Sequence, residues 1–196
     1  MEKAIANFIT YLNIELNYSP HTIRNYQKDL DSFYMFLKKE HIANWSLVDY
    51  AVMRNYLNFL YQKKYQVKTT NRHISTLKSF FKYLKKTQII KINPLDLITN
   101  RKEEKRIPNY LHYYEIEELL NIPETQFKVR NQLILELLYA TGVRVSELVN
   151  IAVNDIVVNE KTIKVFGKGR KERYVIFGNK LLSLIKEYLN TRTNLD

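Results

Sequence analysis

The chain has 196 residues, of which 45% are hydrophobic, so it can build one globular domain or two small ones. It contains no cysteine, which excludes disulfides, thiolate metal sites and a cysteine nucleophile. The formal net charge is +11 and no apolar run reaches about 18 residues, so we expect a cytoplasmic protein with an acidic partner rather than a membrane protein.

The positive charge is concentrated in the first half of the chain. Residues 1–100 hold 15 lysines and arginines against seven acidic residues, whereas residues 107–196 hold 12 against 11. No acidic residue occurs between Asp49 and Asp96, a stretch that carries ten basic ones. This distribution predicts a face that binds a polyanion such as DNA. The alternative is a solvated basic surface that binds nothing.

Helical periodicity predicts four helices in residues 1–100. They cover approximately residues 3–16, 20–37, 49–61 and 70–84. Ser19 followed by Pro20 is typical of a helix start, and Thr69 or Thr70 is expected to cap the fourth helix. Leu16 is expected on the apolar face of the first helix. Short links between the four segments predict a compact helical domain.

Polar and basic side chains of the second and fourth predicted helices are candidates for DNA contacts. They are Arg24, Asn25, Lys28, Thr69, Thr70, Asn71, Arg72, His73 and Lys78. Hydroxyls, an amide and the start of a helix can bind phosphates. Arg72 and His73 are expected to project away from the core, where they could reach base edges in a major groove. The alternative for each residue is a helix cap or a solvated charge.

Residues 101–108 are rich in charge and end in a proline, which predicts a linker between domains at 1–100 and 109–196. In the second domain the pattern predicts a short acidic helix at 113–120 and a long helix at 128–139. A strand region at 156–177 and an amphipathic helix at 180–192 follow. The predicted fold class is therefore mainly α with a small β-sheet.

Two motifs in the second domain point to phosphate chemistry. In residues 139–148 (YATGVRVSEL), Gly142 is expected to end one helix and the next to begin near Ser146, so that Arg144 lies at a corner. In residues 164–176, alternating apolar residues around Gly-Lys-Gly predict a β-hairpin that carries Lys168 at its tip. We expect the rigidly held arginine and the lysine on the strand turn to point to the same place. Together they would make a site for a phosphodiester.

These two motifs and their spacing resemble the tyrosine site-specific recombinases of the phage integrase family, and among them the bacterial Xer type. The resemblance implies a four-helix, SAM-like core-binding domain followed by the N-terminal portion of an α+β catalytic domain. It also implies a linker that lets the two domains close around double-stranded DNA. In a full-length form it implies a homo- or hetero-tetramer on two duplexes, used for chromosome-dimer resolution, integration or inversion.

The chemistry of DNA cleavage without a metal or other cofactor suits these residues. The planar fork of Arg144 can bind two non-bridging phosphate oxygens and does not lose its charge. Lys168 can protonate the leaving 5′ oxygen. The resemblance implies that Glu147 orients Arg144, and the alternative is a surface glutamate or a partner for a nearby lysine. Arg170, Lys171 and Arg173 are expected to contact backbone phosphates around the site.

The resemblance also implies a nucleophilic tyrosine that forms a 3′-phosphotyrosyl link, and a His-x-x-Arg motif, both beyond the last predicted helix. The four histidines precede Arg144, and none is followed by arginine three positions later. Tyr174 and Tyr188 are expected to pack against the fold. We therefore expect a chain that corresponds to about two thirds of a recombinase and binds DNA without cutting it.

Two alternatives remain at this point. The chain could be a natural truncated relative that binds recombination sites as a regulator or decoy, although such a protein would not need Arg144 and Lys168. It could also be a helix-turn-helix transcription factor in which the match at residues 139–173 is accidental.

Overall fold

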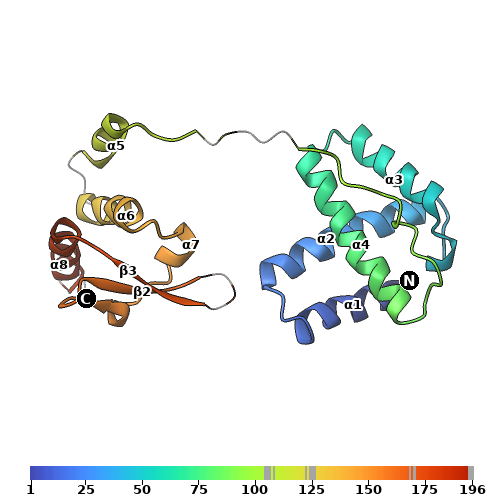
Figure 1. The fold of residues 1–196 in the computed structure, drawn as a ribbon, viewed down its shortest axis with the longest axis horizontal. Coiled ribbons are helices and arrows are strands. Elements are labelled where there is room, and N and C mark those ends of the chain that lie inside the picture. Colours follow the sequence, from blue (N-terminus) through green and yellow to red (C-terminus); the bar gives the residue numbers. More distant parts are fainter. Residues whose placement is uncertain are drawn as a thin grey trace. The chain divides into compact units, whose positions relative to one another are not determined.

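The computed structural model describes residues 1–103, 107, 109–121, 123, 127–167, 169 and 171–193. The chain forms two compact units, Met1–Arg106 and Ile107–Asp196 (Figure 1). The predicted fold class is confirmed, because the structure is mainly helical and contains one small antiparallel sheet. Among the residues that the structure describes, no helix combines the length and the apolar character needed to cross a bilayer.

Four helices build the first unit. They are α1 (Glu2–Ile14), α2 (Pro20–Lys39), α3 (Tyr50–Gln62) and α4 (Val67–Lys86), with a short 3-10 helix, η1 (Trp45–Leu47), before α3. Local sequence explains two of the starts. Ser19 Oγ accepts a hydrogen bond from the Thr22 N–H at 3.2 Å with Pro20 in the first helical position, and Asp49 Oδ1 accepts one from the Val52 N–H at 2.9 Å.

The core of the first unit is rich in aromatic rings. Phe33 and Tyr56 meet edge to face at 4.8 Å between ring centroids, and Trp45 meets Phe80 at 4.9 Å. Such contacts add to the apolar area that each ring buries. The segment after α4 also packs back on this core, since Ile90, Leu95 and Ile98 are buried. Residues 87–98 therefore belong to the domain.

Two details of the first unit differ from the sequence predictions. Leu16 is 43% exposed, because α1 ends at Ile14 and the amides of Glu15 and Leu16 both bond to the Tyr11 carbonyl as the helix unwinds. Thr69 and Thr70 do not cap α4. The Thr70 N–H already donates to the Gln66 carbonyl, so the helix begins at Val67 and both threonines lie in its first turn.

The predicted linker at residues 101–108 is only partly within the described residues, because residues 104–106 and Pro108 lie outside them. Its first residue is attached to the first unit. Asn71 Nδ2 donates to the Arg101 carbonyl at 2.9 Å, and the Arg101 N–H donates back to Asn71 Oδ1 at 3.0 Å. This paired contact extends the fixed part of the helical unit as far as Arg101.

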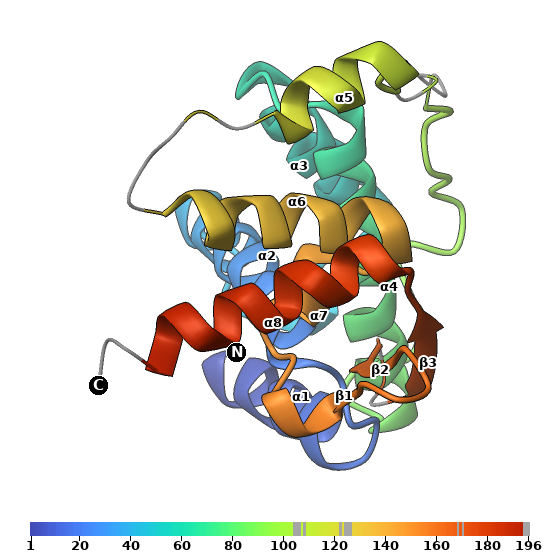
Figure 2. The same ribbon diagram turned by 90° about the vertical axis from the view of Figure 1, so that its left-hand side faces the viewer.

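The second unit packs helices on a three-stranded antiparallel sheet. Its helices are α5 (Tyr113–Leu120), α6 (Lys128–Thr141), α7 (Val145–Leu148), η2 (Val153–Asp155) and α8 (Asn179–Thr193). Its strands, in the order β1-β2-β3, are β1 (Ile156–Val157), β2 (Thr162–Phe166) and β3 (Glu172–Ile176). Figure 2 shows α8 running beside α6. The core between helices and sheet includes Leu137, Ile163, Val175, Leu181 and Ile185.

Candidate functional site

Arg144 lies at a corner between two helices, as the sequence predicts. Helix α6 ends at Thr141, and Gly142 has a φ of 62°, the left-handed conformation that favours glycine. A side chain at Gly142 would meet nothing within 4 Å, so the backbone conformation and not crowding explains the glycine. Val143 is buried, and Arg144 then occupies the N-cap position of α7 with its side chain 67% exposed.

Glu147 is the organising residue of this corner. It is only 4% exposed, and its carboxylate accepts four hydrogen bonds. Arg144 donates through Nη1 to Oε1 at 2.7 Å and through its backbone N–H to Oε2 at 2.8 Å. Arg173 donates through Nη1 to Oε1 and through Nη2 to Oε2, both at 2.8 Å. The alternative of a surface glutamate is therefore wrong.

The three-residue cluster links α7 to the hairpin of β2 and β3. Arg173 lies on β3 opposite Val165 of β2, and its two-pronged bond to Glu147 joins residues 26 positions apart. Gly167 follows β2, and a side chain there would come within 3.5 Å of both Glu147 Oε1 and Arg173 Nη1. The Gly167 N–H donates to the Lys171 carbonyl at 2.8 Å and closes the base of the hairpin tip.

The hairpin tip is only partly within the described residues. Lys168 and Arg170, expected at the tip, lie outside them. Lys171 is exposed. Arg173 was expected to contact DNA phosphates, but both ends of its guanidinium fork bond to Glu147, so its geometry fits the holding of that carboxylate better.

These contacts depress the pKa of Glu147 well below its usual range. The hydrogen bonds from Arg173 contribute most, followed by the Arg144 N–H. Since the folded state favours the ionised carboxylate, the cluster stabilises the second unit above the unfolded pKa of about 4.3, and this contribution is lost as the pH falls below that value.

We therefore expect Glu147→Gln to lower the melting temperature of the chain at pH 7, and the difference from the wild type to shrink between pH 4.5 and pH 3. Thermal unfolding followed by circular dichroism at several pH values measures this difference. Glu160→Gln, which changes an exposed glutamate of the same unit, is the matched control. A difference that stays constant down to pH 3 would contradict the ionised cluster.

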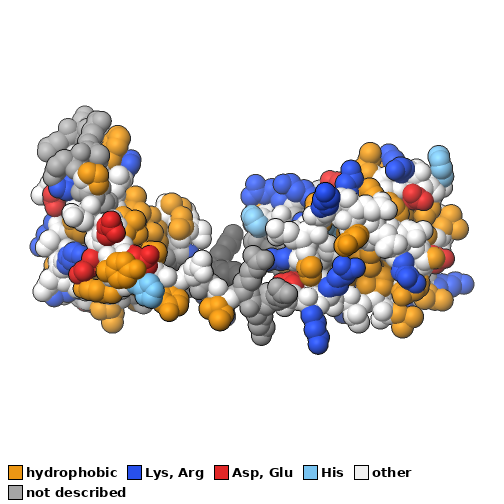
Figure 3. All heavy atoms as spheres, turned by 90° about the horizontal axis from the view of Figure 1, so that it is seen from above, with side chains coloured by type: hydrophobic (Ala, Val, Ile, Leu, Met, Phe, Trp, Pro, Cys, Tyr) orange, Lys and Arg blue, Asp and Glu red, His pale blue; other side chains and the backbone are white. Residues whose placement is uncertain are grey.

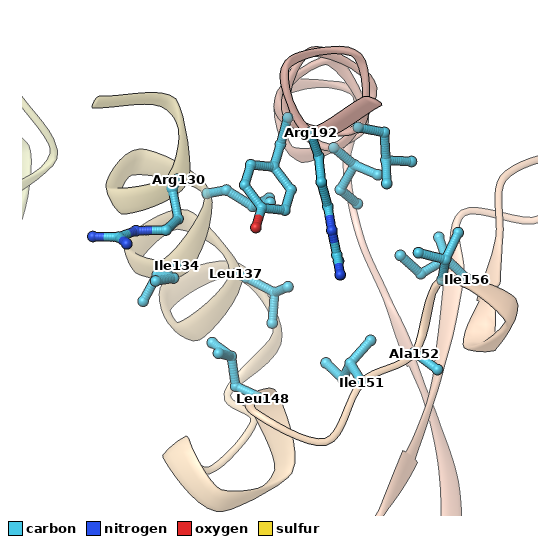
Figure 4. Close-up of a pocket in the computed structure, with 13 residues that line it drawn as sticks. Arg130, Ile134, Leu137, Leu148, Ile151, Ala152, Ile156 and Arg192 are labelled. Carbon is cyan, nitrogen blue, oxygen red and sulfur yellow. The ribbon is translucent and has the colours of Figure 1, made fainter. Parts of the chain in front are cut away.

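An apolar pocket of the second unit lies away from this cluster. It has a volume of about 240 Å³ and lies between α6, α8 and the segment after α7, where Leu137, Leu148 and Ile151 line it (Figure 4). Among the described residues, its lining includes Arg130 and Arg192 but no acidic residue. The pocket offers no general acid or base beside a nucleophile, so it is not the candidate site.

In the first unit the candidate DNA-contact residues divide into exposed and buried groups. Arg24, Lys28 and Arg72 are exposed, and Asn25, Thr69, Thr70 and Lys78 are partly buried. Asn71 and His73 are buried. Figure 3 shows lysine and arginine side chains spread over one face of this unit with few acidic ones between them.

The prediction that His73 projects away from the core is wrong. Its ring is 4% exposed, with Nδ1 at 3.1 Å from the Tyr56 hydroxyl and Nε2 at 3.3 Å from Asp29 Oδ1. Position 73 lies four residues before Leu77, so it shares the buried stripe of α4. Asp29 is a functional candidate that the sequence did not single out. A signal was present, because Asp29 lies three residues after Tyr26 and four before Phe33. This spacing places its carboxylate on the apolar stripe of α2.

Two family models match the chain. The model of the phage integrase N-terminal SAM-like domain matches residues 5–88, and the model of the phage integrase family matches residues 109–196. The tyrosine recombinase XerC of Bacillus subtilis (strain 168) is 40% identical over 186 residues, and that of Halalkalibacterium halodurans is 38% identical over 187. Each match covers 94% of this chain, and the chain spans 61% and 62% of these relatives, respectively.

Solved structures show the same fold. The recombinase XerH bound to a palindromic difH substrate, in a post-cleavage complex, aligns with a TM-score of 0.72 and 22% identity over 96% of this chain and 57% of that one. A lambda integrase dimer, residues 75–356, bound to a COC′ core site, aligns with a TM-score of 0.72 and 18% identity over 97% of this chain and 68% of that one.

Proposed function

Because the chain belongs to the phage integrase family of tyrosine site-specific recombinases, we propose that it binds double-stranded DNA and supplies the Arg144 part of a site that cuts and rejoins it. The observation that carries this proposal is the buried Glu147, which holds Arg144 at a fixed corner next to the hairpin that leads to Lys168. Such a geometry suits a preorganised phosphate site.

In the proposed reaction, a tyrosine oxygen attacks the scissile phosphorus and the bond to the 5′ oxygen breaks. Arg144 stabilises the charge that develops on the non-bridging oxygens, because its Nη1 is held by Glu147 and its exposed side leaves donors for a phosphate. Lys168 transfers a proton to the leaving 5′ oxygen. The phosphotyrosyl link conserves the bond energy, so the reverse steps rejoin a strand without a cofactor.

We assign the nucleophile to no residue of 1–196. Tyr174 lies on β3 opposite Lys164 of β2, and Tyr188 lies on α8 beside the apolar pocket. The identity to proteins named tyrosine recombinase XerC supports a role in site-specific recombination. We propose the cytoplasm as its location, chromosome-dimer resolution as its use and a tetramer on two duplexes as its active form.

In this proposal, the first unit makes most of the contacts that bind DNA. Arg24, Lys28 and Arg72 are exposed on α2 and α4, with Thr69, Thr70 and Lys78 on the same helices. The positive charge of Arg24, Lys28, Arg72 and Lys78 fits the phosphate backbone, which dominates the affinity of DNA-binding proteins. The burial of Asn71 and His73 removes them from the set of proposed contacts.

The affinity of the 196-residue chain for a duplex of about 30 base pairs should fall by roughly three orders of magnitude between 50 and 200 mM salt, as expected for six or more phosphate contacts. Fluorescence anisotropy of a labelled duplex measures this dependence. The double change Arg24→Ala and Lys28→Ala should reduce the slope by about 2. Lys186→Ala, which removes a positive charge from α8, is the control and should leave the slope unchanged.

A flat salt response would contradict the DNA-binding proposal. The same chain should form no covalent adduct with a nicked duplex that traps a phosphotyrosyl link. A covalent adduct would instead assign the nucleophile to a tyrosine within residues 1–196.

A further inference from the structure

A carboxylate is buried in the helical unit between α2 and α4. Asp29 is 1% exposed, and its partners lie on α4. Arg72 donates through Nη1 to Oδ1 at 2.6 Å, Thr76 donates through Oγ1 to Oδ2 at 2.8 Å, and His73 Nε2 lies 3.3 Å from Oδ1. Burial of a carboxylate is costly unless it is paired and hydrogen-bonded, so this cluster is specifically arranged.

The charge of Asp29 is balanced by Arg72 and not by His73. Burial lowers the pKa of His73, which favours the neutral ring over the charged one. The ring lies between Asp29 and the Tyr56 hydroxyl, which in turn donates to Ser32 Oγ at 3.2 Å. Arg72 is therefore the cation of the cluster, and His73 and Tyr56 occupy the interior beside Asp29.

Arg72 is the member of the cluster that reaches solvent. Its side chain is 42% exposed, and its Nη1 is held by Asp29 and by the Asn25 carbonyl at 3.4 Å. Within the described residues, the structure gives no partner for its Nε and Nη2 groups. One turn away on α4 lie Thr69 and Ser75, two short polar side chains.

We propose that Asp29 is a positioning residue for DNA binding: from within the core it fixes the guanidinium of Arg72, whose remaining N–H donors then bind duplex DNA. The inference rests on the proposed DNA-binding function and deepens it. A free arginine loses side-chain entropy when it binds, and an arginine that is already anchored loses less, so the anchor raises affinity. The remaining donors suit a phosphate oxygen or the edge of a guanine.

The direction in which Asp29→Asn changes the affinity for DNA separates a positioning role from a simple effect of charge. Asp29→Asn removes a negative charge beside a basic face, so charge alone predicts tighter binding of DNA. If Asp29 acts through Arg72, the affinity should instead fall by about tenfold. Fluorescence anisotropy with the 196-residue chain and a labelled duplex of about 30 base pairs, at a temperature at which circular dichroism shows both proteins folded, measures the difference.

Three further variants extend the experiment. Arg72→Ala should weaken binding by about tenfold and, if the donors contact a phosphate, reduce the salt slope by about 1. The double variant Asp29→Asn with Arg72→Ala should bind no more weakly than Arg72→Ala alone, because the two residues act as one. Thr76→Val removes the hydrogen bond to Asp29 Oδ2 but leaves Arg72 anchored, so its affinity should match that of the wild type.

Arg72→Lys keeps the charge but not the fork, and it tests the idea even if Asp29→Asn does not fold. We expect it to bind several-fold more weakly than the wild type. A wild-type chain that binds no duplex would overturn the proposed function and this inference together. If the wild type binds and both Arg72→Lys and any folded Asp29→Asn bind as tightly, the positioning role is overturned while the DNA-binding function stands.

Discussion

Arg144→Ala should reduce DNA cleavage by about three orders of magnitude while leaving DNA binding nearly unchanged. The loss is large because the arginine acts where charge develops in the transition state, and water in its place provides no fixed positive charge. Binding is expected to persist, because the excess of positive charge lies in residues 1–100.

The proposed reaction assigns the nucleophile to no residue of 1–196, so the measurement uses a longer polypeptide. Residues 1–196 can be joined to the part of the Bacillus subtilis relative that lies beyond the match, since the two proteins are 40% identical over 186 residues. Covalent trapping on a nicked duplex reports cleavage, and anisotropy reports binding. Arg144→Lys, which keeps the charge but cannot bind two oxygens through a planar fork, should recover only part of the rate.

A different result would assign Arg144 another role. If Arg144→Ala abolished binding or unfolded the second unit, the residue would serve the corner between α6 and α7 as a structural cap. The 67% exposure of its side chain argues against such a role.

Features set by neighbouring residues could be predicted from the sequence. Gly142 ends α6 because a left-handed residue is needed there, and Ser19 and Pro20 begin α2 through one hydrogen bond and a fixed φ. The β2–β3 hairpin follows from alternating apolar residues around Gly167 and Gly169. Each of these signals lies within about ten residues, which is why one sequence suffices to find it.

Features set by packing between distant segments could not be predicted. Burial of His73 depends on Asp29, 44 positions earlier, whose carboxylate makes an interior site for a polar ring. The direction of Arg173 depends on how β3 meets α7, 26 positions earlier. From the sequence alone, His73 and Arg173 are both residue types that commonly contact DNA. Only the tertiary structure shows which basic side chains already have an acidic partner.

Arg173→Ala should reduce cleavage by about a hundredfold with little change in DNA binding, and this outcome separates a positioning role from a phosphate contact. The two hydrogen bonds from Arg173 hold the carboxylate that orients Arg144, and they attach the hairpin to α7. Without these hydrogen bonds, the positions of Arg144 and of the hairpin are no longer fixed relative to each other. A misplacement of about 1 Å at a reacting group can cost a hundredfold in rate.

Lys171→Ala is the matched control on the same hairpin, because Lys171 is exposed and does not bond to Glu147 within the described residues. If Lys171 contacts a phosphate, its loss should lower the salt slope of binding by about 1 and spare the cleavage rate of bound DNA. Arg173→Ala should show the reverse. A drop in the salt slope for Arg173→Ala with unchanged cleavage of bound DNA would return it to the set of phosphate contacts.

Glu147→Gln completes the comparison, because it removes the charge that both arginines share. Simple electrostatics predicts that loss of a carboxylate near a phosphate site helps an anionic substrate. Positioning predicts a fall in cleavage similar to that of Arg173→Ala, and a double variant no worse than the poorer single one, since the two changes break the same contact. Additive losses in the double variant would mean that Glu147 and Arg173 act on the reaction independently, despite the two hydrogen bonds that join them.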